Sequence, residues 1–367
     1  MSSRVEIWLD TPTGSRLAHL DKFISAECIP YIENDYGVIA VELPNDYDQY
    51  IRLDGMVEFW LDGFLEAVGS IRKWDFYEDE NGVEKTIIVA YTGNYILTSR
   101  IIAYAAGTAQ ASMTDQADDM LKEIVNDNLL GDATGARDLY SAGLNLTKQA
   151  NLADGQSITK SFSWRPLLNV CQDIAAASKE AGTAVYFEFV PELINSETIG
   201  FEFQTFTGQR GINHGSTSND PVYFGKNWGN LYMPRLSRDH TEEINYVYAG
   251  GQGEQSDRNV NEVSDATRYN MSPWNRREGF ADARNESSEN GVTARGYEKL
   301  NEGRPEVAFT AEIVSTPAAQ YRVHWGFGDI VAAEYRDVIY DARISAGSIA
   351  VSSTGEVKIS GRLKVDV

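Results

Sequence analysis

Alternating apolar and polar positions run along both ends of the chain and give way to a helical period only in its middle. The best-marked example is a pair of alternating segments, Met56–Leu61 and Phe64–Ile71, that flank the dipeptide Asp62-Gly63. Asp-Gly favours the two positive φ angles of a type I′ turn, so the pattern predicts a β-hairpin. A two-residue loop predicts three facing pairs: Leu61 with Phe64, Phe59 with Glu66, and Val57 with Val68.

The first hundred residues repeat this strand-like pattern. Short strands are expected at residues 5–9, 23–31, 36–43, 71–77 and 83–91. Turn-forming sequences such as Glu80-Asn81-Gly82 separate them. The succession predicts an N-terminal antiparallel β-barrel domain over residues 1–107.

The period of the pattern changes in residues 108–235. Apolar residues three and four apart in Thr114–Leu130 predict an amphipathic helix with Thr114 as its N-cap. A second helix is expected from near Ser163 to Gly182, with Pro166 in its first turn. Strands are expected at residues 184–190 and 199–205, followed by a Gly-, Asn- and Ser-rich loop over residues 208–234. We predict an α+β middle domain.

Strand-like alternation returns in residues 236–367. A strand at residues 241–250 is expected to lead into Gly250-Gly251-Gln252-Gly253, and a polar helix is expected at about residues 280–302. Further strands are expected at residues 307–314, 320–324, 330–335, 338–344 and 348–367. This part is predicted to be a second β-barrel domain that carries a helical insertion.

The two predicted barrels open their hairpins in a similar way. Gly55-Met56-Val57 begins the first hairpin, and Gly328-Asp329-Ile330-Val331 begins the second. The similarity indicates either a duplicated β-barrel or only the chemistry that all hairpins share. If the duplication is real, one chain contains two related barrels.

The charge and cysteine content narrow the possible partners. Lys and Arg number 32 against 54 Asp and Glu, for a net charge of −22, which argues against a surface that grips duplex DNA. No apolar run is long enough for a membrane helix, and the first residues lack the apolar core of a signal peptide, so Sec-type export is not expected. Cys28 and Cys171 are expected to be free thiols in a reducing compartment.

No catalytic, cofactor-binding or metal-binding residues are predicted. The histidines have no ligand spacing, and Gly250-Gly251-Gln252-Gly253 lacks the GK[ST] of a phosphate-binding loop. Acidic residues that neighbour one another, around Glu78, at Asp118-Asp119 and at Glu242-Glu243, could serve glycosidic chemistry. Such neighbours are also expected by chance in so acidic a chain.

Aromatic residues in turn-rich segments are the remaining functional signal. They could anchor a protein interface, stack on sugars, or simply cover the core. The residues concerned are Tyr223, Phe224, Trp228, Tyr232, Trp274 and Trp325.

Several segments, in this order and spacing, resemble the tail-tip baseplate hub proteins of tailed bacteriophages, particularly the siphophage hub group related to the trimeric hub of contractile tails. Their likeness lies in packing motifs and extends over most of the chain. The segments are Leu43-Pro44 before the Gly55–Phe64 hairpin, Thr98–Gly107, Ala117–Val125, Ser272–Arg284 and Gly328–Val331.

The resemblance implies a gp27-like hub architecture, in which two related barrels per chain let a homotrimer form a pseudo-sixfold ring. Such a ring adapts the sixfold tail tube or distal tail protein to threefold tip or fibre proteins. The implied location is the virion tail tip after synthesis in the host bacterial cytoplasm, without stable membrane insertion. The tape-measure protein and DNA would pass through the lumen without specific binding, helped by an acidic wall.

We therefore expect a structural virion protein, not an enzyme, with no cofactor. The chain stops at Val367, soon after the last expected strands, so no fibre, lysin or peptidase extension is expected. Two other functions stay open. One is a baseplate carbohydrate-binding receptor module that uses the aromatics between Tyr223 and Trp274, and the other is a virion-associated glycosidase.

Overall fold

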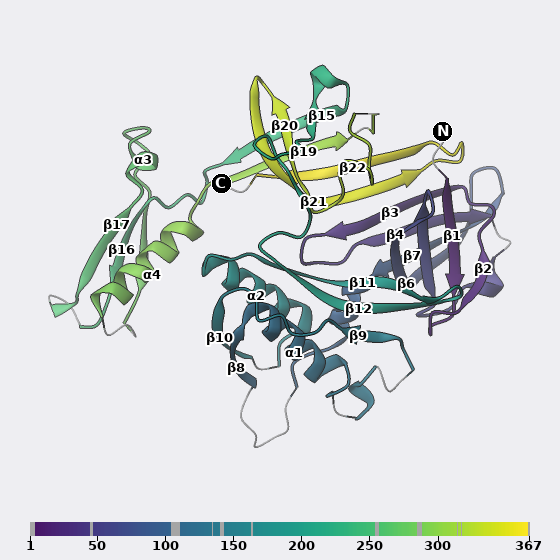
Figure 1. The fold of residues 1–367 in the computed structure, drawn as a ribbon, viewed down its shortest axis with the longest axis horizontal. Coiled ribbons are helices and arrows are strands. Elements are labelled where there is room, and N and C mark those ends of the chain that lie inside the picture. The colour runs from purple at the N-terminus through teal and green to yellow at the C-terminus, as the bar shows by residue number, and fades with distance from the viewer. Residues whose placement is uncertain are drawn as a thin grey trace. The chain divides into compact units, whose positions relative to one another are not determined.

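The structure is a computed structural model that describes residues 4–44, 47–103, 111–133, 135–139, 143–162, 164–253, 257–284, 288–313, 315–316 and 318–365. It is mostly β with a few helices, which confirms the predicted mainly β fold with an α+β insert. The chain divides into two compact units (Figure 1). The first comprises Met1–Met233 and Ala311–Leu363, and the second comprises Pro234–Thr310 with Lys364–Val367.

The N-terminal strands of the first unit form an antiparallel sheet. Their order in the sheet is β2-β1-β5-β6-β7-β4-β3. The strands are β1 (Val5–Asp10), β2 (Arg16–His19), β3 (Ser25–Ile32), β4 (Val38–Pro44), β5 (Met56–Leu61), β6 (Phe64–Glu78) and β7 (Glu84–Thr92), with short 3₁₀ helices η1 (Asp48–Tyr50) and η2 (Gly93–Ser99).

The predicted hairpin is present as β5 and β6, but its register differs from the prediction. Asp62 (φ 51°) and Gly63 (φ 85°) form the expected turn, and Leu61 faces Phe64. Beyond Trp60, the strand β6 contains an extra residue, Glu66, so Phe59 faces Ala67. The predicted pairs of Phe59 with Glu66 and of Val57 with Val68 are therefore wrong, because a β-bulge shifts every later partner by one.

The middle of the chain forms the predicted α+β part. A parallel and antiparallel sheet, in the order β11-β12-β9, lies against two helices (Figure 1). The elements are β8 (Ala111–Gln116), α1 (Ala117–Leu129), η3 (Gly135–Arg137), β9 (Leu146–Lys148), β10 (Ser157–Phe162), α2 (Leu167–Glu180), β11 (Val185–Asn195) and β12 (Thr198–Thr207).

Both middle helices start later than predicted. Thr114 lies in β8 and faces Thr159 of β10, so it does not cap α1. Pro166 holds the N-cap position of α2, whereas Ser163 lies outside the described residues. Gly182 (φ 105°) follows the end of α2 as predicted, because a positive φ suits glycine. The apolar face of α1 is buried throughout, which confirms its predicted period.

The second unit is a small sheet covered by one helix. In it β16 (Tyr246–Gly250) lies between β17 (Val260–Ser264) and β18 (Glu278–Asp282), and α4 (Glu289–Glu302) packs on the sheet. The short helix α3 (Ala266–Tyr269) follows β17. The helix predicted from about residue 280 is thus shorter, because residues 278–282 pair with β16. Gly296 allows α4 to approach closely, since a Cβ there would lie 2.7 Å from Val263 Cγ2.

The last strands return to the first unit. The strands β15 (Leu231–Asp239) and β19 (Glu306–Ile313) carry the chain out of this unit and back, and β20 (Ile330–Tyr335), β21 (Val338–Val351) and β22 (Val357–Lys364) complete the sheet. The strand β21 is continuous where two strands were predicted. Residues 320–324 form turns and not a strand.

The expected loop of residues 208–234 also contains β13 (Asn213–His214), β14 (Tyr223–Gly225) and the short helix η4 (Lys226–Trp228). The strands β13 and β14 pair in parallel with β20, so residues that are rich in Gly and Asn are fixed by a neighbour distant in sequence. None of the helices in the described part of the chain is long and apolar enough to span a membrane.

Candidate functional site

The same strand order occurs twice in the large sheet, and the place where the two sets of strands meet is the candidate functional site. The first copy runs β5-β6-β7-β4-β3, and the second runs β20-β21-β22-β19-β15. We call these strand sets the first repeat and the second repeat. In both, a short strand, a long strand and a third strand follow one another along the chain and lie side by side.

The connections of the two repeats match in detail. Each hairpin turn has two residues with positive φ: Asp62 and Gly63 in one, Arg336 (54°) and Asp337 (61°) in the other. The next loops, residues 79–83 and 352–356, close with the same two backbone hydrogen bonds and carry a glycine of φ 76° at the same position. The two ends of the chain therefore share turn and loop geometry, as a duplication would require.

The outer halves of the long strands β6 and β21 can be aligned without a gap. Ile71 donates its N–H to Gly55 and accepts from Asp54, and Ile344 makes the equivalent bonds with Asp329 and Gly328. From there to the loops, residues 71–78 correspond to residues 344–351. This correspondence fixes which residue of one repeat stands for which residue of the other.

The repeats join where β3 of the first pairs antiparallel with the outer half of β21 of the second. Cys28 faces Ile349, Tyr31 faces Gly347 and Ala26 faces Val351. Arg343 adds an ion pair with Glu33, with Nε 3.0 Å from Oε2. The junction is buried, and the thiol of Cys28 is free.

A cavity of about 550 Å³ lies beside this junction, and its wall is aromatic and ionic. Tyr321, Trp325 and Phe327 pack against one another, with ring centroids 4.9 to 6.2 Å apart. The acidic residues of the wall are Glu66, Glu188 and Asp329, and its arginines are Arg210 and Arg322.

Each of these carboxylates holds a neighbouring segment. Glu66, the extra residue of the bulge, accepts hydrogen bonds from Tyr321 Oη at 2.7 Å and Arg322 Nε at 3.0 Å. Glu188 accepts from Arg210 Nη2 at 2.7 Å. Burial and the Glu66 carboxylate raise the pKa of Tyr321, so its hydroxyl stays a donor. The arrangement can lock the loops before β20 onto β6, and every carboxylate is engaged in doing so.

Asp329 links the same loops to the backbone. Its carboxylate accepts hydrogen bonds from the N–H groups of Ile212 at 2.6 Å and Gly326 at 2.5 Å. Burial raises the pKa of Asp329, although these two donors oppose the shift. The carboxylate therefore fixes the start of the second hairpin.

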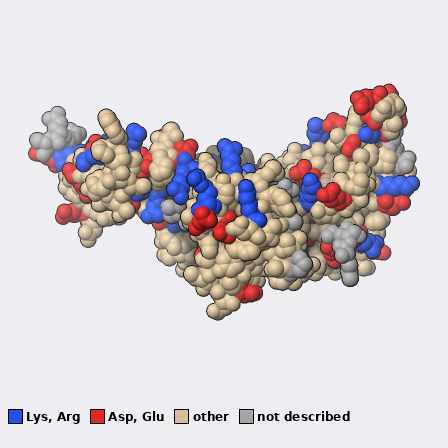
Figure 2. Space-filling model, turned by 90° about the horizontal axis from the view of Figure 1, so that it is seen from above, with Lys and Arg blue, Asp and Glu red and all other residues tan. Residues whose placement is uncertain are grey.

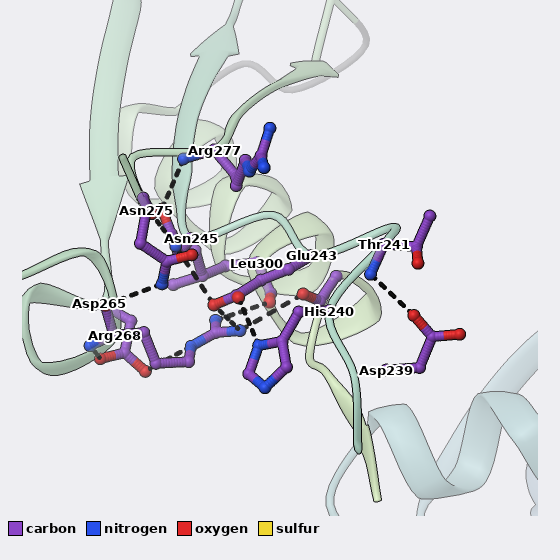
Figure 3. A network of polar contacts seen from close by, with 11 residues as sticks. Asp239, His240, Thr241, Glu243, Asn245, Asp265, Arg268, Asn275, Arg277 and Leu300 are labelled. Carbon is purple, nitrogen blue, oxygen red and sulfur yellow. Dashed lines mark hydrogen bonds and ion pairs between the residues drawn. The ribbon is translucent and has the colours of Figure 1, made fainter. Parts of the chain in front are cut away.

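The second unit has its own buried polar centre at Glu243 (Figure 3). His240 Nδ1 lies 2.8 Å from Oε2 of Glu243, and Asn245 Nδ2 donates to Oε1 at 3.1 Å. Burial alone would raise the pKa of Glu243, but the hydrogen bonds from His240 and Asn245 lower it. Arg268 completes the centre by donating to the carbonyls of Leu300 and Gly303 at the end of α4. This network ties the first residues of the unit to its last helix.

The acidic neighbours named from the sequence have structural contacts. Asp118 binds the buried Lys122 at 2.9 Å, and Asp119 accepts the N–H of Leu152 at 2.9 Å. Glu243 lies in the network of Figure 3. Glu78 ends β6 next to the loop. In the described ranges, no group of three or more His, Cys, Asp or Glu side chains could hold a metal ion.

The aromatic residues named from the sequence divide into a buried set, an exposed set and the half-buried Tyr223. Phe224 and Trp325 are buried and pack edge to face, with ring centroids 5.4 Å apart. Trp228, Tyr232 and Trp274 are exposed, and Trp274 is the most exposed of them at 88%. The core interpretation therefore holds for the first two, and an interface or a sugar platform is open only to the exposed set.

On one face of the molecule, charged side chains of both signs are mixed (Figure 2). On the face shown in Figure 2, basic and acidic side chains lie beside each other. The excess of acidic residues is thus not gathered on this face.

The sequence did not indicate the role of Glu66, because only the bulge turns this residue toward Tyr321 and Arg322.

Comparison with a family model places nearly the whole chain in a known group. The model of Siphovirus ReqiPepy6 Gp37-like proteins matches residues 4–360. No curated protein matches the chain.

Solved structures share the fold over almost their entire length. A 43 kDa tail protein of prophage MuSo2 from Shewanella oneidensis has a TM-score of 0.60 at 11% identity, with 98% of each chain covered. A tail protein from Neisseria meningitidis MC58 has a TM-score of 0.59 at 13% identity, with coverage of 99% of this chain and 97% of that one. Prophage tail protein gp18 from Listeria monocytogenes EGD-e has 0.53 at 11%, with 99% and 94% covered. The fold is that of prophage tail proteins.

Proposed function

Because the chain belongs to the family of Siphovirus ReqiPepy6 Gp37-like proteins, we propose that it is a structural tail protein that forms the trimeric hub of a phage tail tip. The observation that carries this proposal is the strand order that occurs twice in one sheet. Three chains with two equivalent units each present six similar units around one axis. Such a ring fits a sixfold partner on one side while remaining threefold in its chains.

The proposed ring has partners on both sides and in its lumen. The distal tail protein or tail tube protein would bind one side, and fibre or tip proteins the other. The tape-measure protein and the DNA would pass through the lumen at ejection. A net charge of −22 suits this passage, because an acidic wall repels DNA and keeps it from adhering.

The proposal retains the three domains expected from the sequence. Residues 1–107 would supply one ring unit, residues 108–235 the α+β domain, and residues 236–367 the second ring unit. The ion pairs of Glu66 with Arg322 and of Glu33 with Arg343 would keep the two ring units in one fixed relation. The protein would act without catalysis.

Imaging tests the proposal directly. Virions labelled with an antibody against the chain should carry label at the tail tip, and averaged images of that tip should show a threefold ring with a pore. Native mass spectrometry of the purified chain should give three copies at high protein concentration. Label along the tail shaft or on the capsid, or a tip with two copies, would contradict the hub.

A second function is favoured by one observation, the 88% exposure of Trp274. A freely accessible indole is typical of surfaces that stack on sugar rings. In this case Trp274→Ala would abolish binding of the chain to host-wall polysaccharide, while Trp164→Ala, at another exposed tryptophan, would not. Equal binding by both variants would remove the carbohydrate-binding module from consideration.

A further inference from the structure

In the large sheet, the outer half of β6 and the strand β15 each have an edge without a partner strand within the described residues. The strand β6 pairs with β5 as far as Ser70, and Ile71 bonds with Asp54 and Gly55, so beyond Ile71 the outer half of β6, residues 71–78, pairs with β7 alone. The strand β15 stands at the end of the sheet and neighbours only β19. We call these the β6 edge and the β15 edge. Unpaired edges are templates for another strand.

The repeats show which strand would cover the β6 edge. Residues 71–78 correspond to residues 344–351 of β21, and in β21 this half is covered by β3. At one pair of corresponding positions, Ile349 is 0% exposed and Phe76 is 56% exposed. The β6 edge is therefore in the state that β21 would have if β3 were removed.

The covering strand of the first repeat corresponds to β15 in the second. In the strand order, β3 follows β4 just as β15 follows β19. Both strands contain a proline after an apolar residue, in Ile29-Pro30-Tyr31-Ile32 and in Met233-Pro234-Arg235-Leu236. Proline in a strand is typical of sheet edges and irregularities, and the pairing of β3 with β21 is irregular at this point.

We propose that the β15 edge of one copy pairs antiparallel with the β6 edge of the next copy, as β3 pairs with β21 within the chain. This inference rests on the proposed hub, because it names the seam by which its chains meet. Aligning Pro234 with Pro30 gives the register of the seam. Within the chain, Cys28 faces Ile349 and Tyr31 faces Gly347. In the seam, Tyr232 takes the place of Cys28 and faces Phe76 of the next copy. Arg235 takes the place of Tyr31 and faces Trp74.

The residues that meet at this seam complement each other. Tyr232 is 50% exposed in the single chain, so the seam would bring together two half-exposed aromatic rings. Aromatic pairs that face across strands stabilise a sheet. An arginine over the face of Trp74 adds a cation–π contact. The occupant of both edges is therefore a second copy of this chain, because each edge matches the strand that the other supplies.

Engineered disulfides test the register. The full chain with Tyr232→Cys and Phe76→Cys should form covalent dimers and trimers on mild oxidation with diamide, and reduction should return single chains. Facing residues of an antiparallel pair bring their Cβ atoms close enough for a disulfide. The native Cys28 and Cys171 are buried and do not compete.

The matched control shifts one cysteine by a single position. Tyr232→Cys with Asp75→Cys places the two thiols on opposite faces of the seam, since successive side chains alternate. This variant should give at least tenfold less crosslinked product under the same conditions. Equal crosslinking of both variants, or a disulfide within one chain, would overturn the proposed register.

Native mass spectrometry of the same samples separates the seam from the hub. A trimer that forms without crosslinks between residues 232 and 76 would overturn the seam and leave the hub in place. A chain that stays single in solution and is absent from the tail tip would overturn the hub and the seam together.

Discussion

The outer halves of β6 and β21 have the same place in two matching repeats, yet one is exposed and the other is buried. They follow equivalent hairpins and end at loops with equivalent hydrogen bonds. In β21, Ile349 is covered by β3, whereas in β6 the corresponding Phe76 faces solvent. The difference teaches that burial at these positions depends on the strand that lies alongside, and that only one of two equivalent positions finds this strand within its own chain.

Buried carboxylates beside the two hairpins make a second contrast. Asp329 precedes β20 and accepts two backbone N–H groups. Asp10 faces Met56 at the start of β5, and in the described structure neither of its carboxyl oxygens has a hydrogen-bond partner. Burial and the nearby Glu58 carboxylate raise the pKa of Asp10 to about 8.

The largest expected effect on the free energy of unfolding comes from replacing Asp10. The folded chain keeps the Asp10 proton up to about pH 8, whereas the unfolded chain releases it near pH 4. Between these values the unfolded state binds fewer protons, so stability falls as pH rises. Asp10→Asn should remove this fall, and its free energy of unfolding should gain on the order of 5 kcal/mol relative to wild type between pH 4 and pH 9. Urea unfolding across this pH range measures the gain.

The control for this experiment is Asp329→Asn. It should be less stable than wild type by about 1–3 kcal/mol at pH 7, because the amide replaces a charged acceptor of two N–H groups. A parallel pH dependence in wild type and Asp10→Asn would show that Asp10 is ionised in the folded chain, and the contrast would be lost.

The next effect tests the covered edge against the open edge. Ile349→Ala should lower the free energy of unfolding by about 2–5 kcal/mol, because it removes a fully buried side chain. Phe76→Ala, at the corresponding position, should change the stability of the single chain by less than about 0.5 kcal/mol. Chemical denaturation at a concentration where the chain is monomeric compares the two. Similar losses would mean that Phe76 is covered in the monomer.

A smaller effect tests the equivalence of the loops. Gly82→Ala and Gly355→Ala should each cost about 1–2 kcal/mol, because both glycines have a φ of 76° and the added Cβ would meet only ordinary contacts or open space. Thermal unfolding of the two variants should show nearly equal losses. Clearly unequal losses of stability would contradict the equivalence of the two loops.

The smallest effect comes from exchanging the hairpin turns. Asp337→Gly should raise stability by about 0.5 kcal/mol, since glycine adopts a positive φ without steric cost. Gly63→Asp should lower it by a similar amount. Both turns are two-residue loops with positive φ, so the two changes should have opposite signs in the same denaturation assay. Equal signs would contradict their equivalence.

These residues also show how far the sequence predicts the structure. The dipeptide Asp62-Gly63 is a local signal, and its turn and the facing pair of Leu61 with Phe64 are as predicted. The bulge at Glu66 is not visible in alternation, and the residues that the Glu66 carboxylate binds, Tyr321 and Arg322, lie far away in the sequence. The predicted helix begins at Thr114 and therefore includes the last residues of β8. Pairing with β10, which the local sequence does not show, makes these residues a strand.

The candidate site depended on the same kind of distant pairing. The similar openings at Gly55 and Gly328 indicated a duplication, but the full strand order includes β15, whose Gly- and Asn-rich surroundings favour a loop when read alone. Its strand conformation depends on β19, which begins only at Glu306. Only the assembled sheet shows that β3 and β15 have the same place.

The two open edges are unlike each other, and this makes assembly directional. In the proposed ring, copies that join through them would grow as an arc with one edge of each kind exposed at its ends, until the ring closes and neither the β6 edge nor the β15 edge is left open. A chain that keeps its β6 edge but has a blocked β15 edge could enter such an arc and would then stop its growth. Small amounts of this variant, expressed beside the normal chain, would act as a chain terminator and lower the yield of infective particles out of proportion to their share.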